Sequence, residues 1–586
     1  MDLTEIKQTD IWMLYEKAVN YCRMMNVFGD TDVNYRMYNG DQWYGLKVKG
    51  IEKVQFNFIK PIVRYKTGII LCNLYAIHFS SENFENREFR KNAEKICKLL
   101  NKKASHIWEK DFMDIKLRLV VKDAAINDEG VIYVSWDAEK NMPVNEILNK
   151  TDVFYGNENS SDIQSQPYIL IKQRMSVVQA QKLAKAYGVS EKEIELIVGD
   201  MDNIEEAGES AKYEKDNMCT IVTKLYKENG TVHFAKATRT VDIKMDTDTG
   251  LTYYPVAHLL WEEKKGSARG EGEVRQLIPN QLETNKTAMR RALTVKNTAY
   301  PQKAVNTERV ANQSDLGKVG AVIRITGGST VDDVAKVIKN IPPAQMSADV
   351  KELQNELIQS TRELAGAGDI ATGQINPESA SGRAILAVQQ ASQQPLTEHL
   401  DYTKGFVEEL ARIWLDMLIA YNDSIELEEE EKDPVTGDMY TQMLKVYKAT
   451  LLELQAVVKV DITPKGAFDK YAQEQSLENL LKDGYFSPTR IAELKLYLRT
   501  LDDDSVMPKQ KLEDAVEEYE KEQRKIAEIQ MQGQLMQQRV MQFLMGDPET
   551  QAGQMLDARM QQSVPTGVSK PVDEEIEVDE SNPDDN

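Results

Sequence analysis

The sequence predicts a mixed α+β fold that is mostly α-helical. Apolar residues recur at three- and four-residue steps over several long segments, which is the period of a helix that buries one face. Shorter segments before residue 265 are rich in β-branched and aromatic residues, as strands are. The chain has 586 residues, of which 41% are hydrophobic and 28% charged, enough for several cores of ordinary composition.

Residues 1–265 are expected to form an α+β domain. The predicted helices are 10–28, 56–76, 88–127 with one break, and 175–198 with Ser176 as N-cap, and an aromatic loop is predicted over 34–46. The predicted strands are 131–136, 168–173, 253–263 and two runs within 221–240. Asn229-Gly230 separates those two runs and predicts a two-residue hairpin turn, because both turn positions need positive φ.

The second half of the chain reads as long helices with one excursion between them. The predicted elements are helices 273–299, 347–365 and 396–421, a helical region 478–545, and a strand at 319–328. Apolar and small residues form the predicted inner faces of the first two helices: Val274, Leu277, Ile278, Gln281, Asn285, Ala288 and Ala292, then Val350, Leu353, Leu357, Thr361 and Leu364. The last 15 residues carry eight carboxylates and predict a disordered tail.

The stretch LAGAGDIATGQINPESASG (364–382) contains Gly366, Gly368 and Ala371 in the order G-x-G-x-x-A. A dinucleotide-binding turn with this spacing follows a buried strand and opens a helix at once. Here an amphipathic helix precedes it, and Pro377 keeps the following residues from being helical at once. We therefore expect a mobile loop between two helices. A nucleotide-dependent enzyme that uses this turn is the disfavoured alternative.

The lack of other catalytic and metal-binding motifs in the sequence also argues against an enzyme. No P-loop or nucleophile-elbow motif occurs, and the five histidines (His78, His106, His233, His258 and His399) have no metal-ligand spacing. Asp502 to Asp504 read as a solvated turn, and the four cysteines as reduced buried thiols. We expect no catalytic residues, no cofactor and no metal. No run of about 18 apolar residues and no secretory start occur, so no membrane association is expected.

Charge is distributed unevenly over the chain. The formal net charge is -22, which disfavours a broad nucleic-acid-binding surface. One stretch is basic, with a single acid, Glu283, among six bases: Arg275, Lys286, Arg290, Arg291, Lys296 and Lys303. A solvated helix face is the simpler interpretation, and a surface for an acidic helix or for phosphates is the functional one. The helix 522–545 carries seven Gln and four Met and suits packing against copies of itself.

Four stretches, in this order, resemble the portal protein of tailed bacteriophages. They are YNGDQW (38–43), GEGEVRQLIPNQLETNKTAMRRAL (270–293), SGRAILAVQQASQQPL (381–396) and KLYLRTLDDDSVMPKQKLEDAVEEYEKEQ (495–523). Each is weak alone, but their order and the elements between them agree with that family. The resemblance covers about residues 10–545.

The resemblance implies a portal-like architecture with wing, stem, clip and helical crown. Its expected parts are the α+β part of the wing (1–265), the first stem helix (266–299), the clip (300–346), the second stem helix (347–365), the tunnel loop (366–382), the helical C-terminal part of the wing (383–480), the crown (481–550) and a disordered acidic tail (551–586).

The resemblance also implies a function. The chain would form a dodecameric ring at one capsid vertex, conduct double-stranded DNA during packaging and ejection, and dock the terminase large subunit and a head–tail adaptor. Major capsid and scaffold proteins would be further partners, in the virion and, during assembly, in the host cytoplasm. The residues expected to line the DNA channel are Gly366, Ala367, Gly368, Thr372, Gly373, Gln374, Asn376, Ser379 and Gly382. The alternative is an oligomeric virion adaptor or scaffold protein that conducts no DNA.

Overall fold

The computed structural model describes most of the chain up to residue 464 and short pieces beyond it. The described residues are 8–47, 53–81, 87–200, 217–300, 302–318, 320–327, 336–342, 349–367, 394–432, 439–454, 456–464, 515–516, 519, 525–526, 529–538 and 540–541. The chain divides into two units, Met1–Gly466 and Ala467–Asn586, and the described part of the second is helical. The account below concerns the first unit.

Five helices precede the sheets. They are α1 (Asp10–Met24), α2 (Val27–Asn39), α3 (Ile59–Leu71), α4 (Arg87–Lys110) and α5 (Met113–Asn127). The helix predicted over 10–28 is broken at Asn26, which has φ 56°. The predicted aromatic loop 34–46 was wrong in its first half, because α2 continues to Asn39. The predicted single break within 88–127 is confirmed and lies at Phe112, which has φ 53°.

Two antiparallel sheets form the body of the first unit. The three-stranded sheet has the order β3 (Met142–Leu148), β2 (Glu129–Asp137), β9 (Val256–Leu260). The five-stranded sheet has the order β4 (Val153–Tyr155), β5 (Tyr168–Ser176), β6 (Met218–Glu228), β7 (Thr231–Ala237), β8 (Asp242–Asp248). The predicted strands and the hairpin are confirmed, with Asn229 at φ 52° and Gly230 at φ 89° in its turn.

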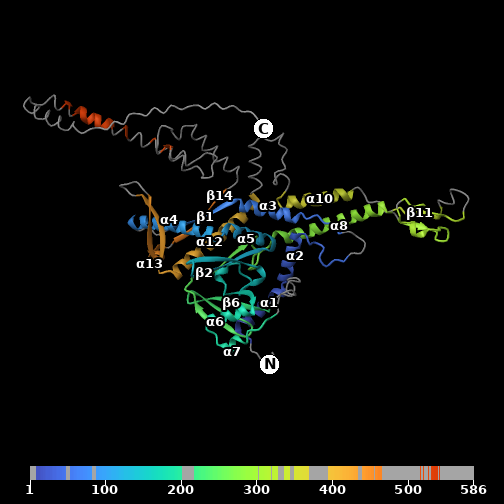
Figure 1. Cartoon of the computed structure of the whole chain (residues 1–586), viewed down its shortest axis with the longest axis horizontal. Helices are drawn as coiled ribbons and strands as arrows, with labels where there is room; N and C mark the ends of the chain where they lie inside the picture. The colour runs from blue at the N-terminus through green and yellow to red at the C-terminus, as the bar shows by residue number, and fades with distance from the viewer. Residues whose placement is uncertain are drawn as a thin grey trace, which may run out of the picture. The chain divides into compact units, whose positions relative to one another are not determined.

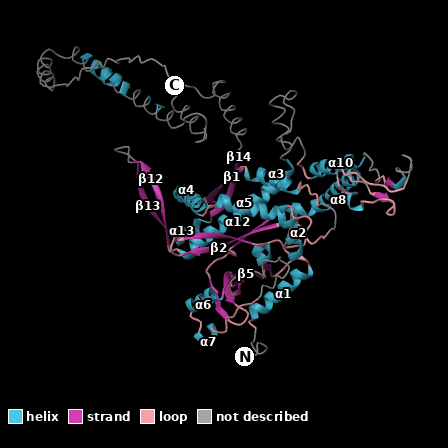
Figure 2. Ribbon diagram, turned by 45° about the vertical axis from the view of Figure 1, so that its right-hand side comes forward, coloured by secondary structure: helices cyan, strands magenta, loops and turns pink. Residues whose placement is uncertain are grey.

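Helices cover both faces of the five-stranded sheet (Figure 2). Because side chains alternate along a strand, Val222 of β6 faces Tyr15 of α1, whereas Ile221 faces Ala180 of α6 (Val177–Ala186). Ser176 caps α6 in a capping box with Gln179, as predicted. A short helix, α7 (Glu191–Ile194), follows α6.

The largest core lies between α3, α4, α5, the three-stranded sheet and α12 (Thr397–Tyr421). The predicted helix 396–421 is confirmed, and it buries Val407, Leu410 and Trp414. The indole nitrogen of Trp414 donates to Asn145 of β3 at 2.9 Å. α12 is therefore tied to the sheet as well as packed on it.

Strands occur after α12 in a region that the sequence predicts as helical. β12 (Ser424–Lys432) pairs with β13 (Met439–Tyr447), α13 (Lys448–Leu454) follows, and β14 (Ala456–Pro464) pairs with β1 (Asn73–Ser81). Val458 and Val460 of β14 are buried and alternate with exposed Lys459. This period of two favours a strand, and the partner strand lies almost 400 residues earlier in the chain.

Two long antiparallel helices extend from the body (Figure 1). They are α8 (Glu273–Ala299) and α10 (Asp349–Leu364), both as predicted, and α8 continues through Pro279. Beyond them a small two-stranded sheet pairs β10 (Lys303–Val305) with β11 (Ile338–Asn340). The strand predicted at 319–328 was wrong within the described residues, where Ile325 makes only an isolated bridge to Val310.

A buried ion network holds the turn that leads into α8. Arg269 donates to Glu129 of β2 and to the carbonyl oxygen of Val153 at 3.0 Å, and its Nε lies 3.3 Å from Glu158. His258 of β9 adds a contact of 2.9 Å to Glu129. Burial alone would raise the pKa of Glu129, but the Arg269 guanidinium and His258 lower it to about 2.

The backbone of this turn passes directly over the end of α5. A Cβ at Gly272 would lie 2.8 Å from the amide nitrogen of Asp128, and one at Gly270 would lie 2.4 Å from the carbonyl oxygen of Glu262. Only glycine allows these approaches. The G-E-G-E sequence is therefore explained by close packing between the body and the first residue of α8.

We predict that Arg269→Leu lowers the free energy of unfolding by about 3–5 kcal/mol, because it leaves Glu129 buried without its main counter-charge. Arg269→Lys, which keeps the charge but not the planar group, should fall between wild type and Arg269→Leu. The measurement is urea denaturation of the full chain followed by circular dichroism.

Lys140→Leu is the control, since it removes a solvent-screened ion pair with Asp137 and should lower the free energy of unfolding far less than Arg269→Leu does. Equal decreases in the free energy of unfolding for Arg269→Leu and Lys140→Leu would show that the buried network stabilises the fold no more than an ion pair at the surface does.

Candidate functional site

The candidate site is the helix pair α8 and α10 with the segments at its two ends. α8 is unusual because several of its buried side chains are polar: Gln281, Thr284, Asn285 and Thr287. Buried polar groups need hydrogen-bond partners. Gln281 and Asn285 find theirs in the segments that lie against the helix, whereas the buried hydroxyl of Thr284 has no partner among the described residues.

Gln281 and Asn285 bind the backbone of residues 56–58. The amide of Phe58 donates to the Gln281 side chain at 3.1 Å, and the amide of Phe56 donates to the Asn285 side chain at 3.0 Å. Gln281 also donates to the carbonyl oxygen of Phe56. These two side chains, one turn apart on α8, form hydrogen bonds with backbone groups that have no partner in a β-strand.

The structure brings two of the predicted motifs together at this point. Asn285, from the α8 motif, donates to Gln42, from YNGDQW. In the same motif, the indole nitrogen of Trp43 donates to the carbonyl oxygen of Val54 at 3.1 Å. Asn57 donates to the carbonyl oxygen of Tyr38 at 2.9 Å. The two sequence motifs are therefore one structural unit that seats α8 on the body.

α8 and α10 are joined by polar contacts on their facing sides. Asn280 donates to Thr361 at 2.9 Å, and Arg291 donates to Gln354. Gln354 and Thr361 are the buried residues of α10. The predicted inner face was therefore wrong in part: Leu353 is 49% and Leu364 84% exposed, because polar pairs rather than leucines face α8.

The helix α10 ends at the first glycine of the G-x-G-x-x-A stretch. Gly366 has φ 68°, and its amide donates to the carbonyl oxygen of Glu363 at 2.9 Å. The amide of Ala367 donates to the carbonyl oxygen of Arg362 at 2.8 Å. This pair of bonds is a Schellman motif, in which a left-handed glycine closes a helix. Gly366 thus has a structural role that needs no nucleotide.

Ala367 is buried, which differs from its expected place in a channel. It is 2% exposed and belongs to the main core, beside a pocket of about 360 Å³ that Phe56, Pro61, Ile62 and Ile358 also line. The other residues predicted for the channel lie outside the described residues: Gly368, Thr372, Gly373, Gln374, Asn376, Ser379 and Gly382. Any channel-lining part of this segment begins after Ala367.

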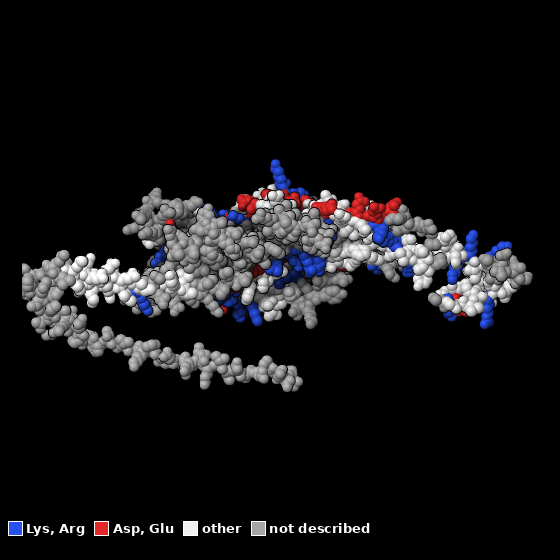
Figure 3. Space-filling view, turned by 90° about the horizontal axis from the view of Figure 1, so that it is seen from above, with Lys and Arg blue, Asp and Glu red and all other residues white. Residues whose placement is uncertain are grey.

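The six predicted basic residues do not form one surface. Arg291 turns toward Gln354 of α10. Lys303 lies beyond α8 in β10, where its ammonium donates to the carbonyl oxygen of Leu316 at 3.2 Å. The other four, Arg275, Lys286, Arg290 and Lys296, are exposed on α8. Figure 3 also shows basic side chains projecting from the end of the molecule that carries β10 and β11.

Two buried groups near the base of α8 have shifted pKa values. Burial raises the pKa of Asp128 to about 6, although the Lys150 ammonium bonded to it opposes the rise. Burial lowers the pKa of His399, whose ring stacks on Trp261 with centroids 4.2 Å apart. Both shifts follow from close packing where α8 and α12 meet the body.

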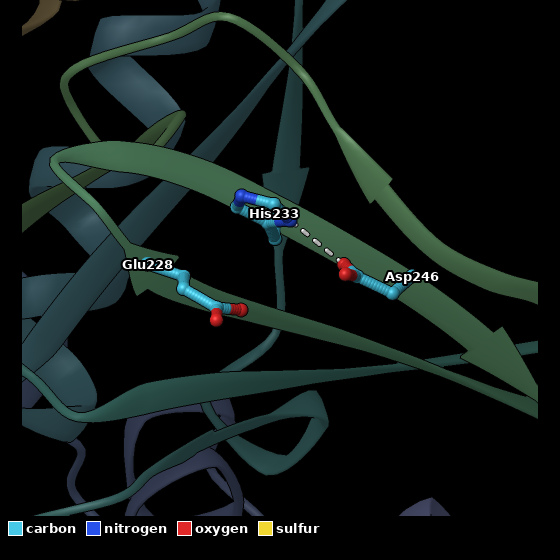
Figure 4. Close-up of side chains that lie close together, drawn as sticks. All are labelled: Glu228, His233 and Asp246. Carbon is cyan, nitrogen blue, oxygen red and sulfur yellow. Dashed lines mark hydrogen bonds and ion pairs between the residues drawn. The ribbon is translucent and has the colours of Figure 1, made fainter.

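One cluster could offer ligands to a metal ion. Glu228, His233 and Asp246 lie on three neighbouring strands, with ligand atoms within 4.8 Å of one another (Figure 4). The Nδ1 atom of His233 already bonds to Asp246 at 2.8 Å, and two of the three residues are exposed. Sequence spacing does not reveal this cluster, since the hairpin turn and β8 bring its members together. The hydrogen bond between His233 and Asp246 explains the closeness of these side chains without a metal ion.

A model of the Phage P22-like portal protein family matches residues 30–565. The chain belongs to this family. The match begins within α2 and includes α8, α10 and the G-x-G-x-x-A stretch. No curated protein sequence matches the chain.

Family membership makes the chain a phage portal protein and a component of the viral capsid, with oligomeric, capsid-associated partners. The family is structural rather than enzymatic. Among the described residues, none of the helices of this portal protein combines the length and apolar character needed to cross a membrane.

We predict that Gln281→Leu destabilises the portal protein by about 1–3 kcal/mol for each backbone group that loses its partner, at Phe56 and Phe58. The measurement is chemical denaturation of the full chain. Gln276→Leu is the control, because Gln276 is exposed on the same helix. A loss no larger than that of the control would mean that the bonds to residues 56–58 do not hold α8.

Proposed function

We propose that this portal protein forms a ring of twelve copies at one capsid vertex and that double-stranded DNA passes through it during packaging and ejection. The observation that carries the proposal is the helix pair α8 and α10. The pair is held to a packed body at one end and bears a small two-stranded module at the other. Repeated around an axis, such pairs would form the wall of a channel.

The parts of the chain then take the roles that the family resemblance implies. Residues 266–299 and 347–365 are the two stem helices, and 300–346 are the clip, which docks the terminase large subunit and later a head–tail adaptor. Residues 1–265 and 383–480 form the wing. The crown is 481–550, followed by the acidic tail 551–586.

The segment 366–382 is proposed as the tunnel loop, and its residues after Ala367 would surround the DNA. It enters from a closed helix end at Gly366, and four of its residues are glycine: Gly366, Gly368, Gly373 and Gly382. Its small uncharged side chains, such as Thr372, Gln374 and Ser379, would touch the duplex without holding it. The net charge of -22 per chain favours sliding, since DNA carries about one charge per 1.7 Å of its axis.

The test of the ring is electron-microscopy imaging of the purified protein, with particle mass measured by light scattering. We expect rings of about twelve copies with an axial hole wide enough for a duplex. A compact monomer or dimer that persists at high concentration and with scaffold protein added would favour the alternative, an adaptor that conducts no DNA.

We predict that Thr372→Lys with Gln374→Lys leaves ring formation unchanged but slows DNA packaging. Each ring would gain two cations per copy around the duplex, and such contacts retain DNA in a salt-dependent way. The measurement is the packaging rate at two salt concentrations. Thr372→Ser with Gln374→Asn is the matched control. Equal rates for both variants would place these residues away from the DNA.

A further inference from the structure

We propose that the exposed basic face of α8 binds the exposed acidic face of α10 on the next copy of this chain. The inference rests on the proposed ring and specifies which surfaces of neighbouring copies meet in it. It assigns the basic residues of α8 to a protein partner rather than to DNA.

The basic face of α8 consists of Arg275, Lys286, Arg290 and Lys296. At about 100° per residue, these four lie within about 120° of one another on the helix surface. The side chains of Arg275, Lys286 and Arg290 are 62%, 48% and 61% exposed. Arg275 pairs with Asp30 at 3.3 Å. Lys286 and Arg290 share the one carboxylate of Glu283, at 3.6 Å and 3.2 Å. The face therefore keeps a surplus of positive charge.

The acidic face of α10 consists of Asp349, Glu352, Glu356 and Glu363. All four are exposed and lie within about 60° of one another on that helix. They point away from α8, because Gln354 and Thr361, which contact α8, occupy the opposite side. Figure 3 shows acidic side chains gathered where α10 lies. Half-exposed Leu353 borders this face, so a partner would also cover apolar surface.

The two faces are placed so that one helix pair can join the next. Viewed along the helix axes, the acidic face lies on the side of α10 away from α8, and the basic face lies on the side of α8 away from α10. Each copy thus presents a different charge on each side. A contact between unlike faces repeats from copy to copy and closes into a ring when the rotation allows.

The charged residues of the two faces also lie at matching positions along the helix axes. Asn280 contacts Thr361, and Arg291 contacts Gln354. Residues farther along α8 therefore lie at the same level along the helix axis as residues earlier in α10. Lys286 then lies within one turn of the level of Glu356, and Arg290 within one turn of Glu352. Rotation about a ring axis that runs along the helices would preserve these levels. Both pairs are four residues apart, about 6 Å along the helix, so two neighbouring ion pairs can form together.

A single exposed ion pair stabilises little, but like charges placed face to face are strongly unfavourable. The faces would therefore act mainly by fixing direction and register between copies. The competing partner of the basic face is the phosphate backbone of DNA, which the net charge of -22 per chain would repel.

The test reverses each face and then both. Lys286→Glu with Arg290→Glu, and separately Glu352→Lys with Glu356→Lys, should each lower the fraction of chains in rings by about tenfold or more at low salt. The four changes together should restore that fraction to within about twofold of wild type. Sedimentation velocity measures the ring fraction, and circular dichroism checks the fold.

Lys339→Glu with Lys351→Glu is the matched control. Both residues are exposed, and the change in net charge equals that of the α8 variant, so rings should form normally. In wild-type rings mixed from ¹⁵N-labelled and unlabelled copies, a carbodiimide should link Lys286 to Glu356 between chains. This second measurement requires no variant to fold.

Normal assembly of both double variants would overturn the pairing while leaving the ring in place. Rings of the α8 variant that package less DNA, without rescue by the α10 reversal, would assign the basic face to phosphates instead. Wild-type protein that forms no rings would remove the ring proposal itself, and the pairing with it.

Discussion

The buried ion pair between Arg269 and Glu129 is the contact on which the arrangement of the helices depends. It ties the turn before α8 to the central strand of the three-stranded sheet, and Glu158 and His258 complete it. An ion pair this deeply buried adds little net stability compared with apolar packing, but losing one partner is costly. Its main effect is positional. A helix of 27 residues is about 40 Å long, so a small change of angle at its base displaces its far end by many ångströms.

The polar residues along α8 add a second constraint, which concerns rotation about the helix axis. Leucines would let α8 roll over its neighbours, whereas Gln281 and Asn285 bond to particular backbone atoms of residues 56–58. A roll by one residue, about 100°, would break these bonds and the Asn280–Thr361 contact together. The rotation of α8 is thus fixed by its buried side, and the outward direction of Lys286 and Arg290 follows from it. Contacts between specific faces of neighbouring copies require α8 to have the same fixed rotation in every copy.

The sequence predicted the elements that local chemistry determines and missed those that distant partners determine. The extents of α8 and α12, the break within 88–127 and the Asn229-Gly230 hairpin follow from periodicity and turn residues. The pairing of β1 with β14 does not, because neither strand shows which strand lies beside it. The six basic residues were visible as a run, but only the fold separates Arg291, which binds α10, from the four that stay exposed. The joining of YNGDQW to α8 through Gln42 also required the structure.

The G-x-G-x-x-A stretch shows how one pattern can arise from different physical needs. A dinucleotide-binding turn uses its first glycine to leave a strand and open a helix, with the phosphates at the helix N-terminus. Here Gly366 closes a helix at its C-terminus, where the backbone carbonyls carry partial negative charge and repel phosphates. That polarity disfavours a nucleotide at this helix end. It would also suit the proposed tunnel loop, because the end of α10 that precedes the loop does not attract DNA. A loop that surrounds DNA without trapping it would need both the freedom of its glycines and this lack of attraction.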